Sequence, residues 1–131
     1  MKFAVSVPTR KAQMEQLRRD RATAPVLRTE FPSLQYLRIE LKFRGSGSSV
    51  PTSQTHMLYP PARAFFEYRC PYSDCDGQFD LNRAVKAALA DATRRAEGVL
   101  ECRGSRGSEA SRHPCLLRLE YEVTATLQQG S

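Results

Sequence analysis

The 131-residue sequence contains no tryptophan, only two histidines and only four lysines. No segment comes near the roughly 20 consecutive apolar residues of a membrane-spanning helix. The opening stretch MKFAVSV has too short an apolar core for a signal peptide, and no small-residue cleavage site follows it. We therefore expect a cytoplasmic protein without membrane association, in a compartment where structural disulfides are rare.

The motifs of common enzyme active sites are also missing. The sequence has no H-E-x-x-H, no Gly-rich phosphate loop and no G-x-S-x-G. Carboxylates do occur near the cysteines, but turn and helix-cap roles explain them: Asp74, Asp76, Asp80 and Glu101. No small-molecule substrate is evident, and a metal-dependent enzyme is less favoured than a binding module.

The amino-acid composition is typical of a globular protein, and the chain is basic. Hydrophobic residues make up 40% and charged residues 26% of the chain, and its net charge is +6. Sixteen of the 20 basic residues are arginines, whose planar fork suits phosphate and carboxylate groups. The arginines indicate either an anionic partner or a coding bias that leaves them solvated on the surface.

Hydrophobic periodicity predicts an α+β fold. Alternating patterns predict strands, and 3.6-residue patterns predict helices; the strands are 2–7, 34–43, 62–70, 99–103 and 115–127, and the helices are 8–25 and 81–96. In the second helix, Asp80 is the expected N-cap and Gly98 the expected stop. We expect an antiparallel or mixed sheet of about four to five strands, with one long amphipathic helix packed on one face.

The chain is long enough for one domain over residues 1–131. Residues 1–30, a short strand and a basic helix with a thin apolar stripe, are expected to dock loosely on the core or to form an arm. Residues 44–60 are rich in Gly, Ser and Pro, which predicts a mobile loop.

The four cysteines follow a C-x4-C and C-x12-C spacing with 26 residues between the pairs. Cys70 ends a predicted strand, Cys75 lies in the turn just after it, Cys102 lies near the end of the next strand and Cys115 opens the last. The topology brings all four to one edge of the sheet. Four thiolates suit tetrahedral Zn²⁺, so the predicted metal ligands are Cys70, Cys75, Cys102 and Cys115. Arginines near them in sequence could offset the negative charge of the site: Arg69, Arg103 and Arg112.

This pattern is similar to that of zinc ribbons, in which two cysteine turns clamp one zinc at the end of an antiparallel sheet. The resemblance covers residues 70–75 and 102–115 only. The chain differs in its four-residue first spacing, in the 12-residue loop that splits the second pair, and in the helix between the halves. The resemblance implies a type of site and no specific family.

Other interpretations of the cysteines stay open. His113 lies two residues before Cys115, and a site of three cysteines plus His113 is an alternative ligand set. The cysteines could also be unlinked core residues or form disulfides. Thiol redox chemistry fits less well because it usually uses C-x-x-C.

The function predicted from these features is that of a small zinc-stabilised binding or regulatory module with a protein partner. The alternative is a nucleic-acid-binding module that uses the basic loop 103–112. There, Arg103, Arg106 and Arg112 would contact phosphates, although the loop has no aromatic residue for base stacking.

Overall fold

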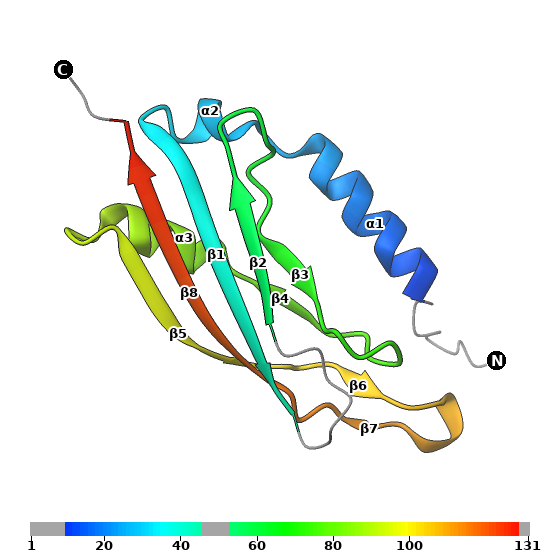
Figure 1. Cartoon of the computed structure of the whole chain (residues 1–131). Helices are drawn as coiled ribbons and strands as arrows, with labels where there is room; N and C mark the ends of the chain where they lie inside the picture. The colour runs from blue at the N-terminus through cyan, green and yellow to red at the C-terminus, as the bar shows by residue number, and fades with distance from the viewer. Residues whose placement is uncertain (1–9, 46–52, 129–131) are drawn as a thin grey trace.

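A four-stranded antiparallel sheet forms the centre of the computed structural model, which describes residues 10–45 and 53–128 (Figure 1). Its strand order is β2-β1-β8-β5, and the strands are β1 (Leu34–Arg44), β2 (Ser53–Leu58), β5 (Arg95–Glu101) and β8 (Arg118–Leu127). Two short hairpins complete the strands: β3 (Glu67–Arg69) with β4 (Gln78–Asp80), and β6 (Ser105–Arg106) with β7 (His113–Pro114). The predicted α+β class with an antiparallel sheet is confirmed.

One face of the sheet is apolar and covered. On β1, Leu37, Ile39 and Leu41 are fully buried, and on β8 so are Leu119 and Val123. The short helix α3 (Asn82–Ala90) and the β3–β4 hairpin both lie over this face (Figure 1). The other face carries the alternate residues of each strand, which are mostly charged on β1, β5 and β8 and are Ser53, Thr55 and Met57 on β2. The period-2 pattern therefore decides which side each residue occupies.

Two helices precede the sheet. The helix α1 (Arg10–Thr23) corresponds to the one expected over 8–25, and the four-residue α2 (Leu27–Glu30) was not predicted. Leu17 of α1 is buried, and the Arg21 guanidinium lies 5.1 Å from the centre of the Phe65 ring. These contacts place α1 against the core. The predicted strand 2–7 lies outside the described residues.

The predicted long helix over 81–96 is wrong in its second half. α3 ends at Ala90, and β5 begins at Arg95. The Asp91 carboxylate accepts a hydrogen bond from the Thr93 amide at 2.9 Å, and Arg94 adopts a left-handed φ of 57°, so the chain turns here. The alanines near the end of the predicted helix are compatible with a helix or with a strand. Residues 95–101 form a strand because all seven pair with β8.

The start of α3 is closer to expectation. Asp80 accepts a hydrogen bond from the Asn82 amide at 2.9 Å, although Leu81 holds the N-cap position. Gly98, expected to stop the helix, lies in the middle of β5 instead. A Cβ at Gly98 would be 2.5 Å from the Tyr121 hydroxyl, so the missing side chain makes room for this ring.

The predicted mobile loop over 44–60 is also wrong in part, because residues 53–58 form β2 and pair with β1. Composition did not reveal this edge strand, whose pairing depends on a long-range partner. Residues 46–52 lie outside the described residues. The strand expected over 62–70 is only three residues long, and the strand expected over 99–103 begins earlier, at Arg95.

Within residues 10–45 and 53–128, no helix combines the length and apolar character needed to cross a membrane.

Candidate metal centre

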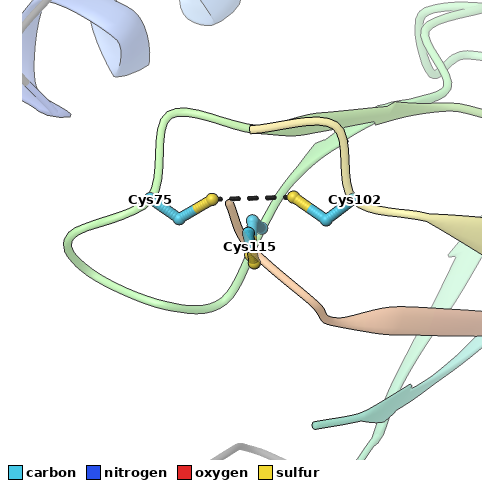
Figure 2. Close-up of side chains that lie close together, drawn as sticks. Cys75, Cys102 and Cys115 are labelled. Carbon is cyan, nitrogen blue, oxygen red and sulfur yellow. Dashed lines mark hydrogen bonds between the residues drawn. The ribbon is translucent and has the colours of Figure 1, made fainter. Parts of the chain in front are cut away.

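The four cysteines converge at one end of the sheet. Cys70 follows β3, Cys75 lies in the β3–β4 turn, Cys102 directly follows β5, and Cys115 directly follows β7. All four are buried, with exposed fractions between 1% and 6%, and their sulfur atoms lie within 4.8 Å of one another. Figure 2 shows Cys75, Cys102 and Cys115 approaching from separate segments of the chain. The predicted convergence is confirmed.

The sulfur separations match those of a metal site. The Cys70 and Cys115 Sγ atoms are 3.8 Å apart, and those of Cys75 and Cys102 are 3.5 Å apart. Four sulfurs at about 2.3 Å from a tetrahedral ion would be about 3.8 Å from one another. A disulfide would need about 2.05 Å, and all four cysteines are free thiols. The cluster is therefore positioned to bind a metal ion.

Two similar turns hold the cluster, each with the sequence Cys-x-Gly. In one, the Gly77 amide donates to the Cys75 sulfur at 3.3 Å; in the other, the Gly104 amide donates to the Cys102 sulfur at 3.4 Å. Each glycine carbonyl also accepts from the amide of another cysteine. Cys70 donates to Gly77 at 3.0 Å, and Cys115 donates to Gly104 at 2.9 Å. The site is thus two matching halves.

Neither Gly77 nor Gly104 has room for a side chain. A Cβ built on Gly77 would lie well inside van der Waals contact with the Cys102 sulfur. A Cβ on Gly104 would be 2.6 Å from the Gly77 Cα and 2.8 Å from an Asp76 carboxylate oxygen. The two turns therefore pack backbone against backbone, which brings their sulfurs together.

Hydrogen bonds and burial shift the pKa of three of the four thiols, and in different directions. The hydrogen bond from Cys70, opposed by burial and aided by the Gly104 amide, lowers the pKa of Cys102 to about 5. The same hydrogen bond, with burial, raises the pKa of Cys70, and burial raises the pKa of Cys75 to about 12. A bound cation of charge +2 would remove this penalty and hold all four sulfurs deprotonated.

Two aspartates in the β3–β4 turn hold the segment between Cys102 and Cys115. Asp76 accepts hydrogen bonds from the Ser105 amide at 2.8 Å and from Arg112 at 3.0 Å. Asp74 accepts from Arg106 at 3.0 Å and from the Gly107 amide at 3.1 Å. Desolvation by burial raises the pKa of Asp74, but the hydrogen bond and the charge of Arg106 outweigh it and keep this pKa below its ordinary value.

Of the three arginines predicted to contact phosphates, two form ion pairs within the protein and one is exposed. Arg112 is paired with Asp76, and Arg106 is paired with Asp74 while its guanidinium lies 3.5 Å from the centre of the Tyr72 ring. Arg103 is exposed and lies three residues before Arg106. The basic loop predicted over 103–112 contains a short hairpin, and both aspartates are hydrogen-bonded to it.

His113 is exposed and does not belong to the cluster. Its Nδ1 lies 3.4 Å from the Ser111 carbonyl oxygen. Within the described part of the chain, the only group of metal-ligating side chains close enough to share an ion is the four cysteines.

Two neighbouring groups connect the cluster to the rest of the fold. Arg69, one of the expected basic neighbours, donates to the Cys75 carbonyl at 2.6 Å. Gln13 of α1 donates to the Asp76 carbonyl at 2.8 Å and to the Gln78 side chain at 3.1 Å. The N-terminal helix is therefore docked on the turn that carries Cys75.

Sequence reasoning missed the role of Gly104 and of the two aspartates as hairpin anchors. The repeated Cys-x-Gly, at residues 75–77 and 102–104, was the available signal for the paired turns. Comparisons of the chain with protein-family models, with curated proteins and with solved structures find no match.

Proposed function

We propose that the protein is a small zinc-stabilised binding or regulatory module that engages a protein partner. The observation that supports zinc is the group of four buried sulfurs at the spacing of a tetrahedral thiolate site. In this proposal Cys70, Cys75, Cys102 and Cys115 are the four ligands. Such a site has no open coordination position, so the metal serves the fold and not a reaction.

A metal here would join segments that are far apart in sequence. It would link the β3–β4 turn to the ends of β5 and β7, which carry Cys102 and Cys115. Binding energy at a site of this kind is folding energy. The thiols must stay reduced to bind the metal. This requirement agrees with the predicted cytoplasmic location.

An exposed leucine beside the cluster favours a protein partner. Leu116 directly follows Cys115, and 76% of its side chain is exposed. It borders a small hollow together with Tyr72, His113 and Pro114. An apolar side chain held in the open by a rigid site is a suitable anchor for a protein contact.

Nucleic acid is the second candidate, supported by the net charge of +6 and by the exposed Arg103. Its support is reduced because Arg106 and Arg112 already pair with aspartates. An enzyme has less support, since Asp74 and Asp76 are occupied as hairpin anchors.

Titration of the zinc-loaded protein with short DNA and RNA duplexes and single strands, at about 50 mM and about 200 mM salt, separates the two partners. We expect no salt-dependent binding. Affinity that falls steeply with salt and weakens in Arg103→Ala would instead support the nucleic-acid candidate. Arg103 is the appropriate site, because replacing Arg106 or Arg112 would also disturb the hairpin.

The protein-partner candidate is tested with cellular proteins that co-purify with the wild type. Their recovery should fall in Leu116→Ser and persist in Tyr59→Ser, a matched variant at another exposed apolar side chain. Equal recovery of these proteins with both variants would show that Leu116 is not the contact residue.

A further inference from the structure

The strand β5 forms one outer edge of the central sheet. It pairs with β8 along seven consecutive residues, Arg95 to Glu101, without a bulge. Among residues 10–45 and 53–128, no strand pairs with its other side, and Figure 1 shows β5 as the outermost strand at that edge. Its outward amide and carbonyl groups are thus a template for another strand.

This edge lacks the strongest protective devices of natural edge strands. β5 contains no proline and no lysine, and one of the four residues on its charged face is the apolar Val99, which is 53% exposed. Only charged residues of that face remain as protection: Arg95, Glu97 and Glu101. Whether they repel a second strand depends on the register in which the two strands meet.

A second copy of β5 can pair antiparallel in three neighbouring registers that keep the same faces together. Centring the two-fold axis on Glu97 places Glu97 opposite itself, and centring it on Val99 places Glu97 opposite Glu101. Centring it on Gly98 places Arg95 opposite Glu101 and Glu97 opposite Val99. Only the Gly98 register avoids a like-charge pair and gains two opposite-charge pairs.

The covered face agrees with this register. Centring on Gly98 places the two glycines opposite each other, and Ala96 opposite Leu100. Tyr121 of β8 lies across Gly98, with its hydroxyl 2.5 Å from where a Cβ would be. No bulky side chain of β5 therefore stands at the centre of the pairing.

We infer that the protein self-associates as a two-fold dimer through β5, centred on Gly98, so that two four-stranded sheets join into one. A closed two-fold contact uses the same edge on both copies and leaves β2 as the outermost of the described strands at each end. Main-chain hydrogen bonds supply the attraction, and the Arg95–Glu101 pairs fix the register. The dimer requires neither the metal nor the partner of the proposed function.

Sedimentation velocity of the zinc-loaded protein, from about 10 μM to about 1 mM, measures this association. We expect a reversible monomer–dimer equilibrium in the wild type. Val99→Glu places a carboxylate opposite Glu97 of the other copy and should weaken dimerisation by at least about tenfold. Val99→Lys places an ammonium there and should leave dimerisation unchanged or tighter.

The two variants together identify the register. The register centred on Glu97 would give the reverse order, because residue 99 would then meet Arg95, and the one centred on Val99 would weaken both variants. A matched change on the opposite edge, Met57→Glu in β2, should leave dimerisation unchanged; circular dichroism checks that each variant is folded. A wild type that stays monomeric at about 1 mM, or variants in any other order, would overturn the inference. A monomer would leave the edge to an extended segment of a different protein.

Discussion

Gly77 and Gly104 pack against each other beside the thiol cluster, each placed two residues after a cysteine whose sulfur accepts a hydrogen bond from the glycine amide. Their backbones are in direct contact, so neither position has room for a side chain. Each glycine also accepts a hydrogen bond from a further cysteine. This pair sets how closely the two halves of the site approach.

Gly77→Ala and Gly104→Ala should each destabilise the zinc-loaded protein by about 1–3 kcal/mol, because the added methyl group pushes the two turns apart. Zinc should also be lost to a competing chelator at a lower chelator concentration. Thermal unfolding and chelator titration measure the two effects. Ser73→Ala, at an exposed position of the same turn, is the control and should change stability by no more than about 0.5 kcal/mol. Alanine variants as stable as the wild type would contradict the close approach.

Asp76→Asn should weaken the hairpin that carries Cys115. The carboxylate accepts from the Ser105 amide and from Arg112, and an amide in its place loses the charge-assisted bond. We expect a loss of about 1–2 kcal/mol in denaturant unfolding, together with faster zinc release. Asp91→Asn removes a carboxylate that also accepts a backbone amide, but before β5 and away from the cluster. Zinc release from this control should match the wild type; equal acceleration in both variants would count against Asp76 as an anchor.

Two leucines of neighbouring sequence should differ sharply in their contribution to stability. Leu119 on β8 is fully buried, whereas Leu116 is 76% exposed. Leu119→Ala should cost about 2–5 kcal/mol in urea unfolding, through lost burial and a residual cavity. Leu116→Ala should stay within about 0.5 kcal/mol. A large loss from Leu116 would show that it belongs to the core, and its proposed role as a partner anchor would fall.

His56 should titrate below the ordinary histidine pKa of about 6.5. Burial lowers the pKa of its ring, with a further contribution from Arg21, and the ring packs 4.6 Å from that of Tyr68. A lowered folded-state pKa means that the unfolded chain binds the proton more readily. The stability associated with neutral His56 is therefore present above pH 6.5 and is lost as the pH falls toward and through the lower folded value. NMR titration of the ring measures this directly, and a midpoint at or above 6.5 would contradict it.

The convergence of the cysteines was predictable from sequence because it needs only the order of strands and a helix. Cys70, Cys102 and Cys115 border strands, and Cys75 lies in the turn that follows Cys70. Antiparallel pairing brings these parts of the chain together. The length of α3 was not predictable in this way, since the alanines of 84–96 fit a helix and a covered strand alike. Pairing with β8 decides between them.

The contacts around the cluster depend on distances that local sequence does not encode. Asp76 bonds to Ser105 and Arg112, 29 and 36 residues away, and Asp74 bonds to Arg106, 32 residues away. Charge alone assigned these arginines to a phosphate ligand. The repeated Cys-x-Gly was the one local pattern that indicated two matching turns. For β2, the Ser- and Thr-containing sequence shows little alternation, and its partner β1 makes it a strand.

Metal content measured on protein purified under reducing conditions tests the central claim most directly. Elemental analysis by mass spectrometry should give about one zinc per chain, and Cys→Ser at any of residues 70, 75, 102 or 115 should lower it. Removal of the metal with a strong chelator should reduce the free energy of unfolding by several kcal/mol and should make all four thiols reactive. A folded protein without metal, unchanged in stability by added zinc or by chelator, would contradict the account.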